Sequence, residues 1–244
     1  MFNKTEIVNA QLPGVIMNEF IPLPSNEIRV DFSSDRDNRA LKAAEQYKNY
    51  VVLLVPDYNA NIASKNAYYK RGVVAKIVLN MTSPNGVRRV KIQTIVRCDI
   101  KGFVEDGTGL IVDFTTVPSF SSDLTKEDAT FDLVRKFVTE NAIDTSLSKD
   151  NINILNKSLT RDEFTDILAF TIHLDKNSKL RYLMETDTTI RLGYVLEDLY
   201  KQKMFKDLEI KIENSVKKSI NESQKEYYLR EKMKAIQEEL GEKA

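Results

Sequence analysis

Apolar residues recur every three or four positions over residues 204–240, and no proline or glycine interrupts this stretch. This spacing is typical of one amphipathic helix. At a rise of about 1.5 Å per residue the helix would be roughly 55 Å long, which exceeds the width of a domain of this size. The sequence therefore predicts a long helix, part of which leaves the body of the protein.

The apolar positions of this helix lie on two faces. One group, here called the proximal stripe, consists of Phe205, Leu208, Ile212, Val216, Ile220 and Tyr227. A second group, here called the distal stripe, lies roughly 120° away on a straight helix and consists of Leu229, Met233, Ile236 and Leu240. We predict that the proximal stripe packs on the chain's own domain. The distal stripe, together with Tyr228, is predicted to bind another molecule. A single helix curving around one core is the alternative.

Turn-forming residues are concentrated in the first half of the chain. Every proline and six of the eight glycines lie at or before position 118. Because proline and glycine mark turns and strand ends, this shift separates a part rich in strands from a helical part. We predict three regions: a β-rich lobe over residues 1–118, a helical lobe over 119–203 and the long helix over 204–244.

The predicted β-rich lobe contains one helix and several strands. The strands are predicted at 28–32, 50–55, 72–79 and 87–98, and the helix at 36–48. Tight turns are expected at Asn85-Gly86 and Asp106-Gly107, which favour hairpins. Residues 57–66 read as a polar loop. These features predict an α+β fold, with a strongly bent sheet or partly open β-barrel instead of a parallel βαβ layer.

The helical lobe contains several residues that are suited to cap helices. Thr125 with Asp128, and Thr160 with Glu163, have the spacing of capping boxes, and Asp187 is positioned to cap a last helix. The apolar spacing after each cap predicts a helical bundle that runs into the long protruding helix. The register of the first strand is not predicted.

Composition excludes several classes of protein. The chain has 36 basic residues (lysine and arginine) and 36 acidic ones (aspartate and glutamate), so its net charge is near zero. This balance argues against a nucleic-acid-binding protein, which usually carries a basic excess to neutralise phosphates. No apolar run approaches the roughly 20 residues of a membrane span, and the N-terminus is too polar for a signal peptide. With Cys98 as its single cysteine, the chain fits a reducing cytoplasm.

No arrangement for catalysis, cofactor binding or metal binding is predicted. Asp106-Gly107-Thr108-Gly109 lacks the spacing and the lysine of a phosphate loop, so we interpret it as a turn. His173 is the only histidine and is expected to end a helix, so histidine and cysteine cannot form a metal cluster. Cys98 lies in a valine-rich strand and is expected to be a small core residue.

The densest basic patch consists of Arg88, Arg89, Lys91 and Arg97. Such a patch could follow a phosphate backbone. However, Arg88 and Arg89 point to opposite faces of a strand, and no aromatic residue lies between them to stack on a base. We therefore interpret the patch as a solvated face.

Three segments carry a family resemblance. They are Tyr227-Tyr228-Leu229-Arg230-Glu231 within residues 223–242, Gly72-Val73-Val74-Ala75-Lys76-Ile77 within residues 69–77, and Phe164-Thr165-Asp166-Ile167-Leu168-Ala169. In these segments the chain resembles the N-terminal region of Lon, the ATP-dependent AAA+ protease. The last part of the long helix is similar to the signature that leads into that family's ATPase module.

The resemblance implies a non-catalytic region that ends before the ATPase module. In that family the region recruits unfolded or damaged protein substrates and supports assembly of a hexamer, while ATP and magnesium are used by the absent modules. The resemblance thus implies no enzyme activity and no cofactor for this chain. The alternative is a separate β-barrel module that binds RNA or a small ligand and dimerises through the long helix.

Overall fold

The structure is a computed structural model of the 244-residue chain and describes residues 2–57, 67–84, 86–107, 109–141 and 149–239. The chain divides into two compact units, residues 1–197 and 198–244. The predicted polar loop lies outside the described residues from position 58 onward, as does Leu240. Within the first unit, strands give way to helices between Val117 and Leu124.

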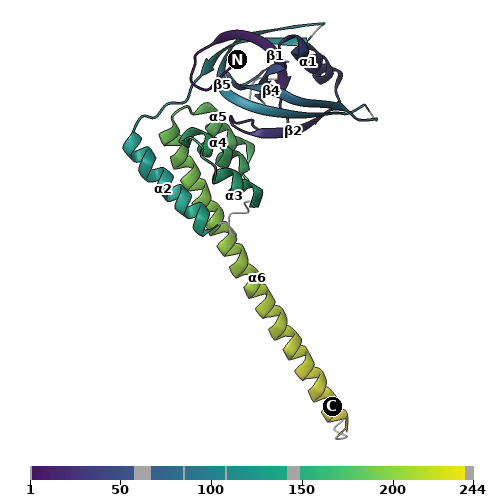
Figure 1. Cartoon of the computed structure of the whole chain (residues 1–244). Helices are drawn as coiled ribbons and strands as arrows, with labels where there is room; N and C mark the ends of the chain where they lie inside the picture. The colour runs from purple at the N-terminus through teal and green to yellow at the C-terminus, as the bar shows by residue number, and fades with distance from the viewer. Residues whose placement is uncertain (1, 58–66, 85, 108, 142–148, 240–244) are drawn as a thin grey trace. The chain divides into compact units, whose positions relative to one another are not determined.

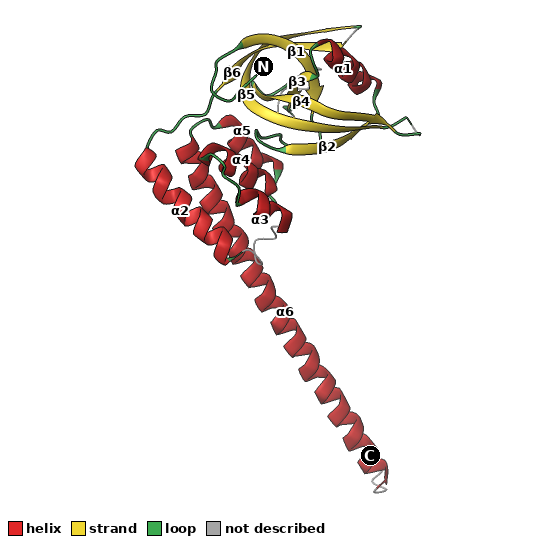
Figure 2. Ribbon diagram, viewed as in Figure 1, coloured by secondary structure: helices red, strands yellow, loops and turns green. Residues whose placement is uncertain are grey.

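The strands form one mixed six-stranded sheet. They are β1 (Asn9–Ile16), β2 (Glu27–Phe32), β3 (Tyr50–Leu54), β4 (Arg71–Thr82), β5 (Arg88–Asp106) and β6 (Gly109–Val117), in the order β2-β5-β4-β3-β1-β6. The 19-residue β5 pairs with β2 and β4 through its first part and with β6 through its last part. The sheet therefore curls round on itself, as Figure 2 shows, and the predicted bent sheet is confirmed.

The inner face of the sheet holds the core of this region. β1 runs parallel to β3, with Gly14 opposite Val52, and antiparallel to β6. β3 is buried along its whole length, as its continuous apolar run predicts. Three of its side chains, Tyr50, Val52 and Leu54, pack with Val74, Val96 and Phe114 in one cluster. Each large apolar side chain buried there contributes about 1.5–3 kcal/mol.

The helices in the described ranges are α1 (Asp35–Gln46), α2 (Leu124–Glu140), α3 (Lys149–Leu155), α4 (Arg161–Thr171), α5 (Lys176–Met184) and α6 (Thr188–Glu239). Figure 1 shows α2 to α5 gathered on one side of the sheet and α1 on another. The capping box of Thr160 and Glu163 is confirmed, and Asp187 accepts a hydrogen bond from the Thr189 backbone. The box predicted at Thr125 is wrong, because Asp123 caps α2 by accepting from the Lys126 backbone.

The predicted turns are present at both hairpins. Between β4 and β5 the Ser83 backbone donates to Val87 O at 2.8 Å, and Gly86 adopts a φ of +81° that suits glycine. Asn85 lies outside the described residues. The second hairpin turns between Asp106 and Gly109, so the glycine-containing segment there is a turn, as expected.

α6 is one helix of 52 residues, where the sequence predicts two. Its buried apolar residues, Leu192, Val195 and Leu199, all lie near its start. The proximal stripe is 51–72% exposed, so the prediction that it packs on the chain's own domain is wrong. These residues belong to the second unit, and helical periodicity shows only that they share a face, not that the chain supplies a partner for it.

Candidate functional site

A buried cluster of ions joins the sheet to the helices of the first unit. Arg97 of β5 is 1% exposed and forms a two-pronged ion pair with Asp166 of α4, with distances of 2.6 and 2.8 Å. Arg191 of α6 contacts Asp166 and Asp162. The interpretation of Arg97 as part of a solvated basic patch is therefore wrong: its strand face is covered by α4 and α5.

Uncharged acceptors complete the surroundings of the two arginines. Arg97 donates to Tyr182 O at 2.7 Å and to Leu183 O at 3.2 Å, and Arg191 donates to Ser119 Oγ at 2.9 Å. Burial of charges is tolerated only when they are paired and hydrogen-bonded. The cluster thus specifies how α4, α5 and the start of α6 pack against β5.

The cluster predicts sensitivity to acid. Burial of Asp162 would raise its pKa, but Arg191 and a hydrogen bond from Ser119 hold the pKa of this carboxyl below its ordinary value of 3.8. A carboxyl whose pKa is lower in the folded than in the unfolded state stabilises the fold at pH values above the unfolded-state pKa. This stabilisation is lost as the pH falls through the folded-state pKa.

We expect Asp162→Asn to reduce stability at neutral pH and to flatten the decline of stability between about pH 5 and pH 3. Thermal melts across this range, with Asp132→Asn on the exposed face of α2 as the control, test this; parallel pH profiles for all three proteins would contradict it.

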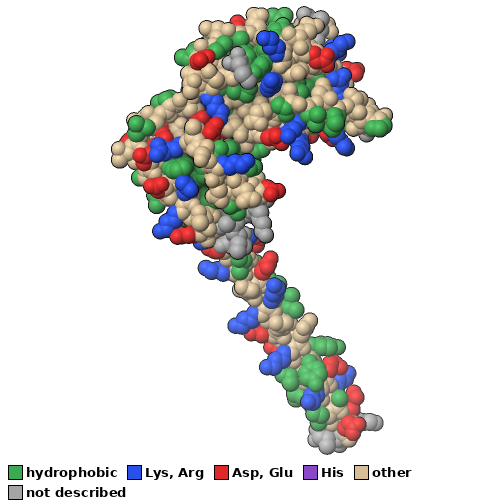
Figure 3. Space-filling view, in the orientation of Figure 1, with side chains coloured by type: hydrophobic (Ala, Val, Ile, Leu, Met, Phe, Trp, Pro, Cys, Tyr) green, Lys and Arg blue, Asp and Glu red, His purple; other side chains and the backbone are tan. Residues whose placement is uncertain are grey.

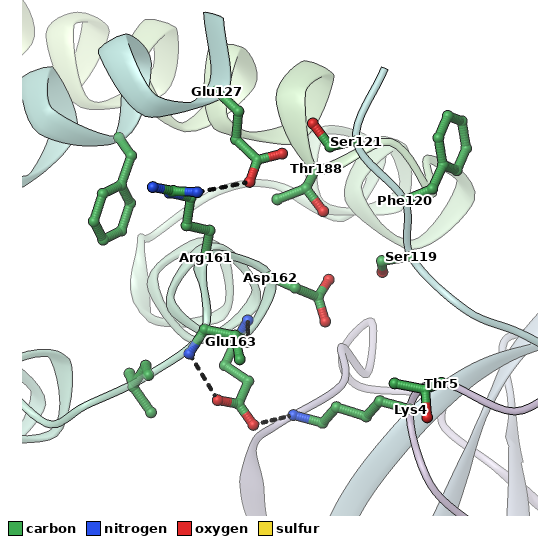
Figure 4. A pocket seen from close by; sticks show the side chains of 13 residues that line it. Lys4, Thr5, Ser119, Phe120, Ser121, Glu127, Arg161, Asp162, Glu163 and Thr188 are labelled. Carbon is green, nitrogen blue, oxygen red and sulfur yellow. Dashed lines mark hydrogen bonds and ion pairs between the residues drawn. The ribbon is translucent and has the colours of Figure 1, made fainter. Parts of the chain in front are cut away.

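A cavity of about 690 Å³ opens beside this cluster. Figure 4 shows its walls, which come from the N-terminal segment at Lys4 and Thr5, the segment 119–121, α2, the start of α4 and Thr188 of α6. The capping box of Thr160 and Glu163 fixes the start of α4 at this wall. Two backbone hydrogen bonds hold Phe120 beside residues 186–188, at 3.1 and 2.8 Å.

Most charges that line the cavity have close partners. Lys4 lies 2.6 Å from Glu163, and Arg191 pairs with Asp162. Arg161 pairs with Asp128 just outside the lining. These pairs leave no strong positive site for a phosphate.

Glu127 of α2 is the exception. It is only 5% exposed, its Oε1 lies 3.8 Å from Arg161 Nη1, and its Oε2 has no hydrogen-bond partner among the described residues. Leaving a buried charged acceptor unsatisfied costs more than about 1–3 kcal/mol. Glu127 lies in the first turn of α2, where the helix dipole stabilises a carboxylate by only about 0.3–1 kcal/mol, so it offsets part of this cost. The cavity is therefore suited to a group that donates hydrogen bonds.

A second hollow lies on the outer side of β2, β4 and β5. It measures about 380 Å³, and its apolar lining includes Leu79 and Met81, which are 44% and 52% exposed. Lys91 lies 2.7 Å from Glu27, and Arg89 lies 3.7 Å from Asp31. Exposed apolar side chains with a rim of paired charges are typical of shallow protein-binding surfaces.

The described residues of the distal stripe are exposed. Tyr228, Leu229, Met233 and Ile236 range from 49% to 63% exposure. Figure 3 shows apolar side chains interleaved with acidic and basic ones along α6. The role of these residues in binding another molecule stays a prediction.

The remaining candidate residues are placed as follows. Cys98 is fully buried in β5, and burial raises the pKa of its thiol, so its expected place in the core is confirmed. His173 is exposed and follows the end of α4 by two residues. Within the described ranges, no group of three or more histidine, cysteine, aspartate or glutamate side chains is arranged to hold a metal ion. The same ranges contain no helix long and apolar enough to cross a bilayer.

The sequence pattern missed both the ion cluster and Glu127. A signal for the cluster existed, because Asp166 interrupts an otherwise apolar stretch of α4 and a buried charge requires a partner. No comparable signal marks Glu127, which reads as one more polar position of a surface helix.

Residues 11–201 match the family model described as the ATP-dependent protease La (LON) substrate-binding domain. The chain is 33% identical to the Lon protease of Aster yellows witches'-broom phytoplasma (strain AYWB) over 238 residues, which is 96% of this chain and 30% of that protein. It is 27% identical to Lon protease 1 of Bacillus subtilis (strain 168), covering 98% of this chain and 31% of that protein. The chain thus spans about a third of the length of these curated relatives.

Two solved structures share the fold. The N-terminal domain of the Mycobacterium avium complex Lon protease matches with a TM-score of 0.64 at 17% identity, covering 78% of this chain and 98% of that one. The Lon N-terminal domain protein from Xanthomonas campestris matches with a TM-score of 0.56 at 14% identity, covering 77% and 98%. The sequence match and the shared fold agree: the chain belongs to the family of the Lon protease substrate-binding domain.

Proposed function

We propose that this chain recruits unfolded or damaged polypeptides to a Lon-type ATP-dependent protease and performs no bond chemistry itself. The match of residues 11–201 to the family's substrate-binding model carries the proposal. The exposed hollow on β2, β4 and β5 supports it, since unfolded chains display apolar segments that folded proteins hide.

The hollow would bind such segments by shallow apolar contact. Leu79 and Met81 supply the apolar surface. The paired charges around them keep this surface soluble when no client is bound. Shallow contacts of this kind accept many sequences, because burial of apolar area does not require a particular side chain. ATP and magnesium would act in other parts of the protease.

Assembly of a hexamer is the second part of the proposal. The distal stripe, Leu229, Met233, Ile236 and Leu240 with Tyr228 beside it, would pack against a neighbouring subunit. Its members are spaced four, three and four residues apart, which is the spacing of a coiled-coil seam.

Among the described residues, the pairing of the basic patch does not favour the alternative of an RNA-binding module. Arg97 is committed to Asp166, and Lys91 and Arg89 lie beside acidic residues. RNA binding would depend on basic side chains that are free to contact phosphates, and three of the four in this patch lie beside carboxylates.

The test is the aggregation of a chemically unfolded client protein, followed by light scattering. We expect the chain to slow aggregation without hydrolysing ATP or the client. Leu79→Ser with Met81→Ser should weaken client binding by about 30-fold, given roughly 1 kcal/mol for each half-exposed side chain. Leu133→Ser on the exposed face of α2 is the control and should act like the wild type. The proposal would be contradicted if the variant with Leu79→Ser and Met81→Ser protected clients as well as the wild type does. It would also be contradicted if the wild type protected no client.

A further inference from the structure

We propose that the cavity beside Glu127 binds the side-chain ammonium group of a lysine carried by the client polypeptide. This inference rests on the proposed function and adds to it a second binding site and a preferred chemistry. The hollow on β2, β4 and β5 would hold apolar segments, whereas the cavity would hold a basic side chain.

The charges around the cavity favour a cation. Three carboxylates and two cations line it. Glu163 has Lys4 at 2.6 Å, and Asp162 has Arg191 in direct contact, but among the described residues Glu127 pairs only with Arg161, at 3.8 Å. The unbalanced negative charge is therefore concentrated at Glu127, and a guest cation would complete its pairing.

The hydrogen-bond acceptors favour an ammonium group in particular. Figure 4 shows the Glu127 carboxylate directed from α2 towards Thr188, with Ser121 beside it. The Ser121 hydroxyl lies 3.0 Å from that of Thr189, and the Thr188 hydroxyl accepts from Arg191 at 3.2 Å. Each hydroxyl oxygen has two lone pairs, so both retain acceptor capacity. An ammonium group has three donors, and Glu127 Oε2 and these two hydroxyls supply three acceptors in the lining of the cavity.

The apolar part of the lining suits the stem of a lysine. Phe120, Phe131 and Leu159 contribute apolar surface to the same cavity. Phe120 is 56% exposed although backbone hydrogen bonds hold it in place, so its ring is available to a guest. A lysine side chain buries its methylene groups along such a surface while its ammonium group reaches a polar site.

The experiment compares two fluorescent, unstructured peptides by anisotropy on the 244-residue chain. They are identical except for one position, which is lysine in one and Nε-acetyl-lysine in the other. We expect the lysine peptide to bind about tenfold more tightly or better, which corresponds to one charge-assisted hydrogen bond. Equal affinity for the two peptides would overturn the inference.

Two variants locate the effect. Glu127→Gln keeps the shape of the side chain and should abolish the preference for lysine. It should not lower the melting temperature, because it removes a buried charge that lacks a full partner. Glu140→Gln makes the same charge change at an exposed position of α2 and should keep the preference. A preference that survives Glu127→Gln would overturn the inference. If Glu127→Gln unfolds the protein, the comparison of peptides on the wild type still decides.

A free amine separates the possible sources of the ammonium group. n-Butylamine should compete with the lysine peptide only at concentrations far above that of the peptide. If it binds as tightly as the peptide, the site takes a small amine and the assignment to a polypeptide is wrong. If an unfolded protein binds but neither peptide does, the inference fails while the proposed function stands. If no unfolded protein binds, the proposed function fails as well.

Discussion

Asp166→Ala is expected to destabilise residues 1–197 by about 3–5 kcal/mol, because it leaves the buried Arg97 without a carboxylate partner. Arg97 would keep only its carbonyl partners, which cannot balance its charge. Arg191 would suffer less, since it retains Asp162. For a unit of this size the melting temperature should fall by roughly 10 °C, which a calorimetric scan measures directly.

Two comparisons show whether the ion cluster is the cause. Asp132→Ala removes the same group from the exposed face of α2 and should change stability by less than about 0.5 kcal/mol. The double variant Arg97→Ala with Asp166→Ala should cost much less than the sum of the single variants, because neither charge is then left unpaired. Additive losses would show that the two side chains do not act as a pair.

Leu229→Ser with Ile236→Ser is expected to weaken self-association by about 100-fold, with little effect on the melting temperature. Both side chains are about half exposed within the chain, so they contribute little to its own core. Burial of two such side chains against a neighbouring subunit is worth roughly 3 kcal/mol in total. Analytical ultracentrifugation of the variant and the wild type over a range of concentrations measures the difference.

Two further variants of α6 serve as controls. Leu208→Ser with Ile212→Ser changes exposed residues of the proximal stripe and should also leave the melting temperature nearly unchanged. Leu192→Ser changes a fully buried residue of the same helix and should lower it clearly. The distal-stripe account would be contradicted if Leu229→Ser with Ile236→Ser unfolds the chain or leaves its self-association unchanged.

Local signals predicted much of the fold. The apolar run of β3, the turn at Gly86 and the capping box at Thr160 each depend on neighbouring residues, and each is present as expected. The bent sheet was predicted from the number of strands joined by tight turns. The length of β5 could not be predicted, because its last part is defined by pairing with β6.

Long-range pairing explains what the sequence could not reveal. Arg97 and Asp166 are 69 positions apart, and nothing close to either identifies the other. The proximal stripe shows the opposite problem: its helical periodicity is real, but periodicity alone does not say whether a partner covers the face. The cavity around Glu127 depends on five separate segments, so its walls become visible only in three dimensions.

Binding to a permanently unfolded polypeptide is the most direct test of the central claim that this chain recruits unfolded protein. The measurement is a titration of the 244-residue chain with a reduced, alkylated protein at low and at high salt, with single-stranded RNA as the comparison. The account predicts saturable binding of the polypeptide that changes little with salt, because apolar contacts contribute most of it. It also predicts negligible RNA binding. No binding of the polypeptide, or RNA binding that falls steeply as salt rises, would contradict the account.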